Sequence, residues 1–311
     1  MNDTRSNHRW ILAFGLTIAV AVQLTVISGT WYLDSDDWFI IDMGRQVVTA
    51  PALDQFTRFW SEEPTWRPLL TARTAVEYAL FGDLAAPRII VNLILHLMCA
   101  LLLFGAVRTW FGRPEAAAWT AVLFAVHPLH AEALTWFHSG FEGITPTLFV
   151  LLTVWLFVSR RPLALGLLAF QLAILTRENS LFLPLLLGAA AAVRAPKSDR
   201  LMRAFTDASP YVALLVANVA LRLVMIYFAG GESTSDFHVV ENPLAAILTT
   251  ALHPWIPIHP ALPLRLTWWV TFAAVPLILI WVQWGMDRRE LKTAFVAFFI
   301  ATLPFLPVFH A

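Results

Sequence analysis

The chain has 311 residues, of which 59% are hydrophobic and only 14% are charged, and it contains 14 Trp and 23 Phe. One soluble core of this length cannot bury so much apolar surface, so the composition excludes an ordinary soluble domain and predicts an all-α polytopic membrane protein. The formal net charge of zero identifies no partner. The single cysteine, Cys99, excludes an internal disulfide and a cysteine-based metal site.

Apolar segments along the chain predict about nine transmembrane helices. The first is too long for the apolar core of a signal peptide, so we expect an uncleaved first span. The fifth and sixth are short for a hydrocarbon core of about 30 Å, and only Thr176 to Asn179 separates them, which favours a shallow helical hairpin. The segments span residues 10–31, 89–107, 116–134, 143–158, 162–176, 180–193, 209–229, 266–284 and 292–309.

The basic residues predict the orientation of these helices. Most Lys and Arg fall in segments that are cytoplasmic if the N-terminus is cytoplasmic, and most acids fall on the opposite face. We expect one membrane-embedded domain over residues 1–311, with a large first external loop at 32–88 and an external cover loop at 230–265. The expected location is a bacterial cell membrane, with the functional residues on its outer face.

Asp34, Asp36 and Asp37 form an acidic cluster directly after the first predicted span. Asp34 or Ser35 would cap a helix over residues 36–48, with the following acids in its positive first turn. Capping needs one acid, and adjacent carboxylates repel each other, so the cluster also suggests proton abstraction or metal binding. The rest of this loop mixes aromatic and charged residues, which predicts amphipathic helices on the membrane surface.

Further polar residues are predicted to lie on the same face. His127 and His130 are three residues apart near the end of the third segment, and Glu132 follows them. This pattern is weak as a metal site, because no third ligand is set by spacing, and such residues also simply close helix ends. Glu142 lies in the next short external loop.

Three more polar groups lie within or between apolar segments. Arg177 and Glu178 lie between the fifth and sixth segments, where they form either a surface salt bridge or a guanidinium site for a phosphate. Asn92 and His96, four residues apart, are predicted to face the bundle interior as interhelical hydrogen-bond partners. Arg222 lies within the seventh segment, where a cation needs an anionic partner from the protein or a ligand.

The chain therefore carries polar motifs in a definite order: Asp36-Asp37-Trp38, Trp66-Arg67-Pro68-Leu69, Asn92-Leu93-Ile94-Leu95-His96, His127-Pro128-Leu129-His130-Ala131-Glu132-Ala133 and Thr176-Arg177-Glu178. Together they resemble the membrane module of glycosyltransferases with the GT-C fold. The likeness is greatest to the protein O-mannosyltransferase-like branch whose eukaryotic members carry tetratricopeptide repeats. It covers about residues 30–185 and weakens towards the end, where Arg222 matches in kind.

This resemblance implies a GT-C-like bundle and an inverting transferase. Such an enzyme moves a sugar, mannose or a similar hexose, from a polyprenyl-phosphate carrier to a hydroxyl of a protein, lipid or glycan at the non-cytoplasmic face. The acceptor needs a base, and the departing phosphate needs cations and hydrogen-bond donors. We expect Asp36 or Asp37 as the base. With Asp36 as the favoured base, Asp37 is an orienting residue or a ligand of a divalent cation. Arg177, Arg222, His127 and His130 are expected around the phosphate.

Supporting roles are expected for Arg67, His96, Glu132, Glu142 and Glu178. The sequence sets no certain cofactor and indicates membrane lipids, but no nucleic acid, as partners.

The sequence departs from the family pattern at two places. Gly140 stands where the family usually has Arg, while Glu142 keeps the acid two residues later, so a substrate contact is absent or is supplied by Arg177. The family also continues beyond Ala311, which favours a shortened member. An inactive scaffold of the same fold is therefore one alternative. The other is a transporter or flippase of lipid-linked or small solutes, which would place ionisable residues near the bilayer midplane.

Overall fold

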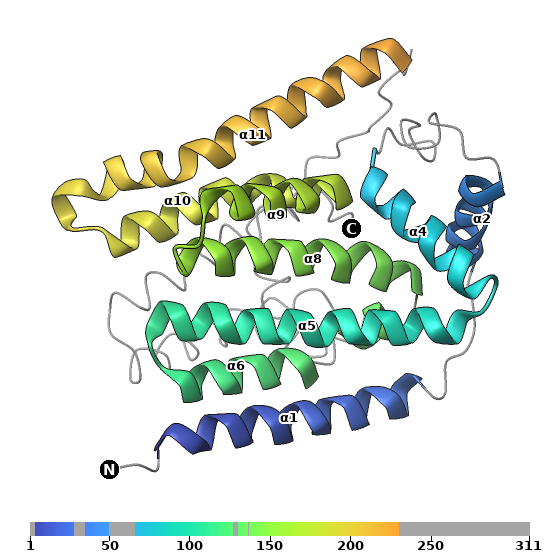
Figure 1. Ribbon diagram of the computed structural model, residues 1–311, viewed down its shortest axis with the longest axis horizontal. Coiled ribbons are helices and arrows are strands. Elements are labelled where there is room, and N and C mark those ends of the chain that lie inside the picture. Colours follow the sequence, from blue (N-terminus) through green and yellow to red (C-terminus); the bar gives the residue numbers. More distant parts are fainter. Residues whose placement is uncertain (1–3, 28–34, 50–65, 127–129, 136, 230–311) are drawn as a thin grey trace, which may run out of the picture. The chain divides into compact units, whose positions relative to one another are not determined.

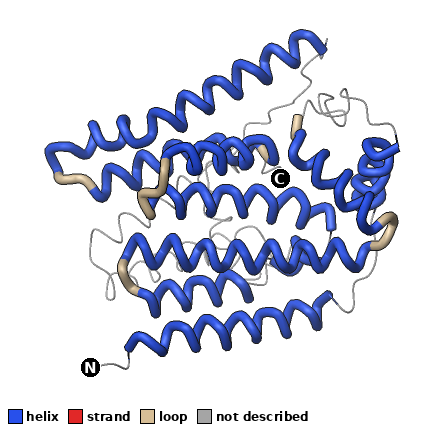
Figure 2. Tube along the Cα trace, in the orientation of Figure 1, coloured by secondary structure: helices blue, strands red, loops and turns tan. Residues whose placement is uncertain are grey.

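The computed structural model describes residues 4–27, 35–49, 66–126, 130–135 and 137–229. This part of the chain is helical without strands, as predicted, and its helices are joined by short turns (Figure 2). The chain divides into two compact units, one with residues 1–180 and 216–234 and the other with residues 181–215 and 235–311.

The elements follow one another along the chain as α1 (Thr4–Ile27), α2 (Ser35–Thr49), α4 (Pro68–Phe81), α5 (Ala85–Phe111), α6 (Pro114–Val126), α7 (His130–Thr135), α8 (Phe137–Val158), α9 (Leu163–Thr176), the 3₁₀ turn η1 (Glu178–Phe182), α10 (Leu183–Arg194), the 3₁₀ turn η2 (Lys197–Asp199) and α11 (Arg200–Ala229). The helix predicted for residues 36–48 is confirmed as α2. Because α11 continues past residue 215, its second half belongs to the first unit.

In the first unit, α1, α6, α5, α8 and α9 lie side by side in this order (Figure 1). Helices α5 and α8 run in the same direction, since Asn92 contacts Phe137 near their starts and Gly105 lies against Trp155 near their ends. Helix α1 runs the opposite way, because His8 near its start stacks on Phe104 near the end of α5.

This arrangement gives the first unit two ends. The loop end holds the starts of α5 and α8, the end of α9, and the helices α2, α4 and α7 (right in Figure 1). The turn end holds the start of α1, the α5–α6 turn and the α8–α9 turn. At the α5–α6 turn, Gly112 adopts a left-handed conformation with φ 68° and donates its N–H to the carbonyl of Arg108, which terminates α5.

Four of the described helices are long and apolar enough to cross a membrane, at His8–Thr25, Ala85–Phe111, Gly140–Val158 and Lys197–Val224. They match the first, second, fourth and seventh predicted segments. The third, fifth and sixth segments are apolar helices of fewer than 18 residues. The 13 residues of α6 rise about 20 Å, which is less than a hydrocarbon core. The last two predicted segments and the cover loop at 230–265 lie outside the described residues.

The third predicted segment, 116–134, is not one helix. Helix α6 ends at Val126, and a separate short helix begins at His130. Pro128 supplies the reason, because it has no N–H to donate to the carbonyl of Phe124 and disfavours helical backbone in the residue before it. The prediction of a single span over these residues was therefore wrong.

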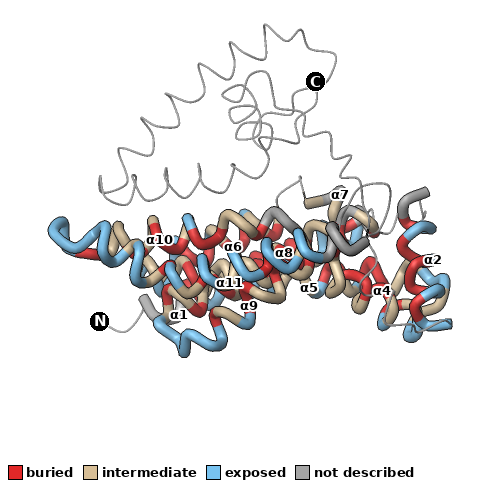
Figure 3. Tube along the Cα trace, turned by 90° about the horizontal axis from the view of Figure 1, so that it is seen from above, coloured by how far each residue is buried: buried red, intermediate tan, exposed pale blue. Residues whose placement is uncertain are grey.

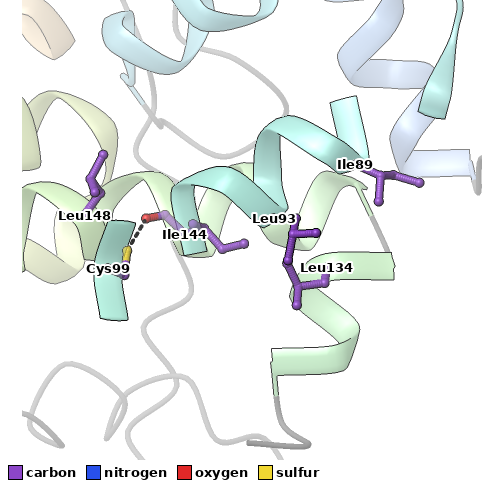
Figure 4. Close-up of a cluster of buried hydrophobic side chains, with 6 residues drawn as sticks. All are labelled: Ile89, Leu93, Cys99, Leu134, Ile144 and Leu148. Atoms are coloured by element: carbon purple, nitrogen blue, oxygen red, sulfur yellow. Dashed lines mark hydrogen bonds between the residues drawn. The ribbon is translucent and has the colours of Figure 1, made fainter. Parts of the chain in front are cut away.

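Apolar residues from three helices fill the centre of the first unit. Buried and exposed residues alternate along the long helices, as amphipathic packing requires (Figure 3). Cys99 lies in this core and its thiol is 3.8 Å from the carbonyl oxygen of Ile144 (Figure 4). The cluster around it joins α5, α7 and α8 through Ile89, Leu93, Cys99, Leu134, Ile144 and Leu148.

Small residues bring neighbouring helices close together in both units. Ala19, Ala100, Ala121 and Ala125 form a buried seam between α1, α5 and α6. In the second unit, a Cβ at Gly188 of α10 would lie 3.4 Å from Ala208 of α11. Short side chains let helix backbones approach closely where hydrocarbon surrounds them.

Candidate functional site

The first turns of α8 connect to the helices of the first loop through polar contacts. His138, Glu142 and Thr145 are spaced so that they share one face of α8. Asp37 of α2 accepts a hydrogen bond from the backbone N–H of His138, and Arg67, which precedes α4, pairs with Glu142. Helix α2 and the start of α4 are thus attached to the first turns of α8.

Asp37 is fully buried, and its Oδ1 atom is 2.7 Å from the backbone nitrogen of His138. His138 is the second residue of α8, where the backbone N–H has no carbonyl partner within its own helix. The positive end of the helix dipole also favours a negative charge at this point. Asp37 therefore caps α8 from another helix, whereas the sequence placed it only in the first turn of its own helix.

Arg67, Glu142 and Arg177 form a cluster from three elements. One oxygen of the Glu142 carboxylate is 2.5 Å from the Arg67 guanidinium, and the other is 3.6 Å from the Arg177 guanidinium. Arg177 also lies 3.4 Å from the main-chain oxygen of Glu142. The side chain of Arg177 is 32% exposed, against 19% for each of the other two, so it is the most accessible member of the cluster.

A second charged group is more deeply buried, between α4, α5 and α8. Arg73 donates to Glu77 at 2.7 Å, to Asn92 at 2.6 Å and to the hydroxyl of Thr145, and its guanidinium lies 4.8 Å from the centre of the Phe141 ring. These contacts give each nitrogen of the largely buried guanidinium a hydrogen-bond partner. Asn92 is fully buried and faces the bundle interior, as predicted.

Arg88 belongs to the same network and is only 1% exposed. It donates to the carbonyl of Gly82 at 2.6 Å, lies 3.9 Å from the Glu77 carboxylate and stacks over the Phe137 ring at 5.3 Å. Glu77 is therefore shared between two arginines. The network fixes the corner between α4 and α5 against the start of α8.

The sequence analysis missed Arg73, Glu77, Arg88 and Thr145. A usable signal was present, since Arg73 and Glu77 are four residues apart, and Arg88, Asn92 and His96 recur every four residues in an otherwise apolar helix. That spacing places a polar stripe on one face of α5. Such a stripe indicates that partners lie on other helices, but it does not identify them.

His96 and His130 contact each other with ring centres 4.7 Å apart. The Nε2 atom of His96 is 3.2 Å from the carbonyl oxygen of Ala125, and the Nδ1 atom of His130 is 2.8 Å from that of Phe124. A carbonyl only accepts, so each of these nitrogens carries a hydrogen. The two imidazoles thus bind two carbonyls in the last turn of α6, those of Ala125 and Phe124.

Arg222 contacts the main chain of α9 and an aromatic ring. Its guanidinium is 2.9 Å from the carbonyl oxygen of Ile174 and 5.6 Å from the centre of the Trp66 ring. One turn earlier on α11, Asn218 exchanges two hydrogen bonds with Gln171. Arg222 and Asn218 together attach the second half of α11 to α9.

Other predicted site residues lie outside the described part of the chain. They are His127 and the side chains of Asp36, Glu132 and Glu178, although Asp36 itself belongs to the first turn of α2. Among the described residues, no three His, Cys, Asp or Glu side chains are grouped so that they could hold a metal ion.

The packing around Gly140 leaves no room for a side chain. A Cβ atom at this position would collide with the carbonyl oxygen of Ala133 and with the side-chain amide of Asn92. An arginine therefore does not fit there in this packing. Two residues later, Glu142 holds two guanidiniums from other parts of the chain, those of Arg67 and Arg177.

Comparisons of this chain with protein-family models, with curated proteins and with solved structures found no match.

Proposed function

We propose that this chain is a membrane glycosyltransferase that moves a sugar, mannose or a similar hexose, from a polyprenyl-phosphate carrier to an acceptor hydroxyl. The observation that carries this proposal is the position of the Arg67–Glu142–Arg177 cluster at the end of the first unit where Asp37 joins α2 to α8. A cationic group for a leaving phosphate and an acidic segment for a hydroxyl acceptor are the two requirements of this reaction.

Arg177 is the residue that we assign to the phosphate. Its contacts with Glu142, at 3.6 and 3.4 Å, are longer than ideal charge-assisted hydrogen bonds, and a third of its side chain is exposed. A planar guanidinium binds two phosphate oxygens at once, which suits an oxygen that becomes more negative as the sugar leaves. Arg222, His127 and His130 remain candidates for further contacts with the carrier.

The acidic segment of α2 supplies the base in this proposal. Asp36 accepts the proton of the acceptor hydroxyl while the hydroxyl oxygen forms a bond to the anomeric carbon. The bond between that carbon and the phosphate oxygen breaks, and polyprenyl phosphate departs with the electron pair, so the anomeric configuration inverts. Asp37 is assigned as the positioning residue, because its contact with His138 holds the first turn of α2 against α8.

The membrane setting is supported by the four long apolar helices among the described residues. We propose that the N-terminus is cytoplasmic and that the loop end faces the outer side of a bacterial cell membrane, where a lipid-linked donor and a protein, lipid or glycan acceptor meet. Embedding the carrier beside the helices would position the reacting bond and reduce the entropic cost of the reaction.

The experiment is release of free polyprenyl phosphate by the purified full chain in lipid nanodiscs, with a panel of polyprenyl-phosphate sugars and acceptors. Asp36→Asn and Asp37→Asn are compared with the unchanged protein, and each reaction is run with and without EDTA to test for a divalent cation. We expect Asp36→Asn to lose about a hundredfold or more in turnover, as removal of a general base does.

If both Asn variants turn over at the unchanged rate, the proposal fails. Movement of the donor across the bilayer without sugar transfer would favour the transporter alternative. Neither transfer nor movement by well-folded protein, across all donors and acceptors, would favour an inactive scaffold.

A further inference from the structure

The turn end of the first unit carries a group of exposed arginines, which we call the basic rim. It comes from three places in the chain: the start of α1, the α5–α6 corner and the α8–α9 turn. Because α5 and α8 run in the same direction and α1 runs against them, these places lie at one end (left in Figure 1). The rim consists of Arg9, Arg108, Arg113, Arg160 and Arg161, all exposed, and the acid that accompanies them among the described residues is Glu115.

Two rim arginines lie over aromatic rings of the helices that they terminate. The guanidinium of Arg108 is 5.9 Å from the centre of the Phe104 ring, and that of Arg161 is 5.9 Å from the centre of the Trp155 ring. Long cationic side chains that cover apolar surface and hold the charge in a polar layer are typical of the level where hydrocarbon meets headgroups. Trp residues collect at the same level.

The helix surfaces next to the rim are apolar and exposed. Trp10 is 72% exposed and Phe14 is 69% exposed on α1, and Leu165 on α9 is 48% exposed. An apolar helix surface that ends in a basic layer matches the two layers of a phospholipid leaflet, acyl chains and then phosphates. The charge of the rim selects lipids whose headgroups carry a net negative charge.

We propose that the basic rim binds the headgroups of anionic phospholipids in the leaflet that contacts the turn end. This inference is independent of the proposed sugar transfer, because it uses none of the residues at the loop end. It rests on the exposure of all five rim arginines and on the exposed apolar helix surfaces beside them.

The test is lipid retention by the full chain, purified in a neutral detergent and titrated with phosphatidylglycerol or with phosphatidylcholine of the same acyl chains. Native mass spectrometry counts the bound lipids. We expect phosphatidylglycerol to bind more tightly, and the triple change Arg108→Gln, Arg113→Gln and Arg161→Gln to weaken that binding by about tenfold or more, since each basic residue near an anionic surface contributes about fivefold.

Arg45→Gln is the matched control, because Arg45 is an exposed arginine of the first unit at the loop end. It should leave the preference for phosphatidylglycerol unchanged. Arg108→Lys should keep most of the binding, since it keeps the charge. If the triple variant folds poorly, the unchanged protein still tests the proposal. Its preference for phosphatidylglycerol over phosphatidylcholine must fall as salt rises from about 0.05 to 0.5 M, because salt screens electrostatic attraction.

Equal binding of the two lipids, or an unchanged preference in the folded triple variant, would overturn the proposal. Displacement of phosphatidylglycerol by millimolar inorganic phosphate would also overturn it, because the rim would then be a site for a soluble anion.

Discussion

The carboxylate of Asp37 caps helix α8 by accepting the backbone N–H of His138, 101 residues further along the chain, at 2.7 Å. This contact joins the acidic segment after the first span to the helix that carries Glu142. It means that a substitution at Asp37 changes two things together, the stability of α8 and the position of the neighbouring Asp36.

Replacing Asp37 should therefore lower the stability of the protein. Asp37→Ala removes the cap and should lower the free energy of unfolding by about 1 to 2 kcal/mol, whereas Asp37→Asn keeps an acceptor oxygen and should cost less. Thermal unfolding in detergent measures both. If Asp37→Ala is as stable as the unchanged protein, the contact with His138 does not support the fold.

Glu77→Gln should strongly lower the free energy of unfolding. The change leaves Arg73 and Arg88 without the carboxylate that they share, and breaking a buried ion pair from one side costs about 3 to 5 kcal/mol. Chemical denaturation of the purified protein measures the loss. Asp42→Asn is the control, because Asp42 is an exposed acid that also contacts an arginine, and such pairs contribute about 1 kcal/mol or less.

Gly140 and Gly143 offer a matched pair within α8. A Cβ at Gly140 would collide with Ala133 and Asn92, whereas a Cβ at Gly143 meets nothing within 4 Å. Gly140→Ala should destabilise the protein by about 1 to 3 kcal/mol, as overpacking does. Gly143→Ala should stabilise it by up to about 1 kcal/mol, because alanine favours a helix. Equal melting temperatures for the two variants would contradict the close contact at Gly140.

Arg177→Gln tests the phosphate assignment. Loss of a preorganised cation at the leaving group should lower the release of polyprenyl phosphate by about 100-fold, and Arg177→Lys should recover only part of it, because lysine lacks the planar fork. Stability should change by about 1 kcal/mol or less, since Arg177 is partly exposed. Arg45→Gln again serves as the control and should keep full turnover. Normal release by Arg177→Gln would remove Arg177 from the site.

Several features of the fold could be predicted because they depend on short stretches of sequence. Apolar segments long enough to span a hydrocarbon core identify the helices around Ile90 and Val150, and the acids near Ser35 identify the start of α2. The prediction failed at Pro128, where one long segment divides into two helices. Proline by itself favours a helix end at this point, but the long apolar segment around it predicted a single span.

The candidate site also combines features that the sequence predicted with features that it did not. The sequence indicated that Arg177 lies between apolar segments and that Asn92 and His96 face inward. It placed Glu142 in an external loop, whereas Glu142 lies in the first turns of α8. It did not show that Arg67 and Arg177 meet on one carboxylate, nor that Glu77 links Arg73 to Arg88. The pairs Arg67–Glu142, Arg177–Glu142 and Glu77–Arg88 each join residues of different elements.

By itself, the sequence determined the class of the protein and the polar character of one end, because hydrophobic length and charge act locally along the chain. Only the tertiary structure decided which helix Asp37 caps and that position 140 has no room for a side chain. Both depend on how closely α8 approaches helices that are distant in sequence, and that distance is set by packing rather than by any local pattern.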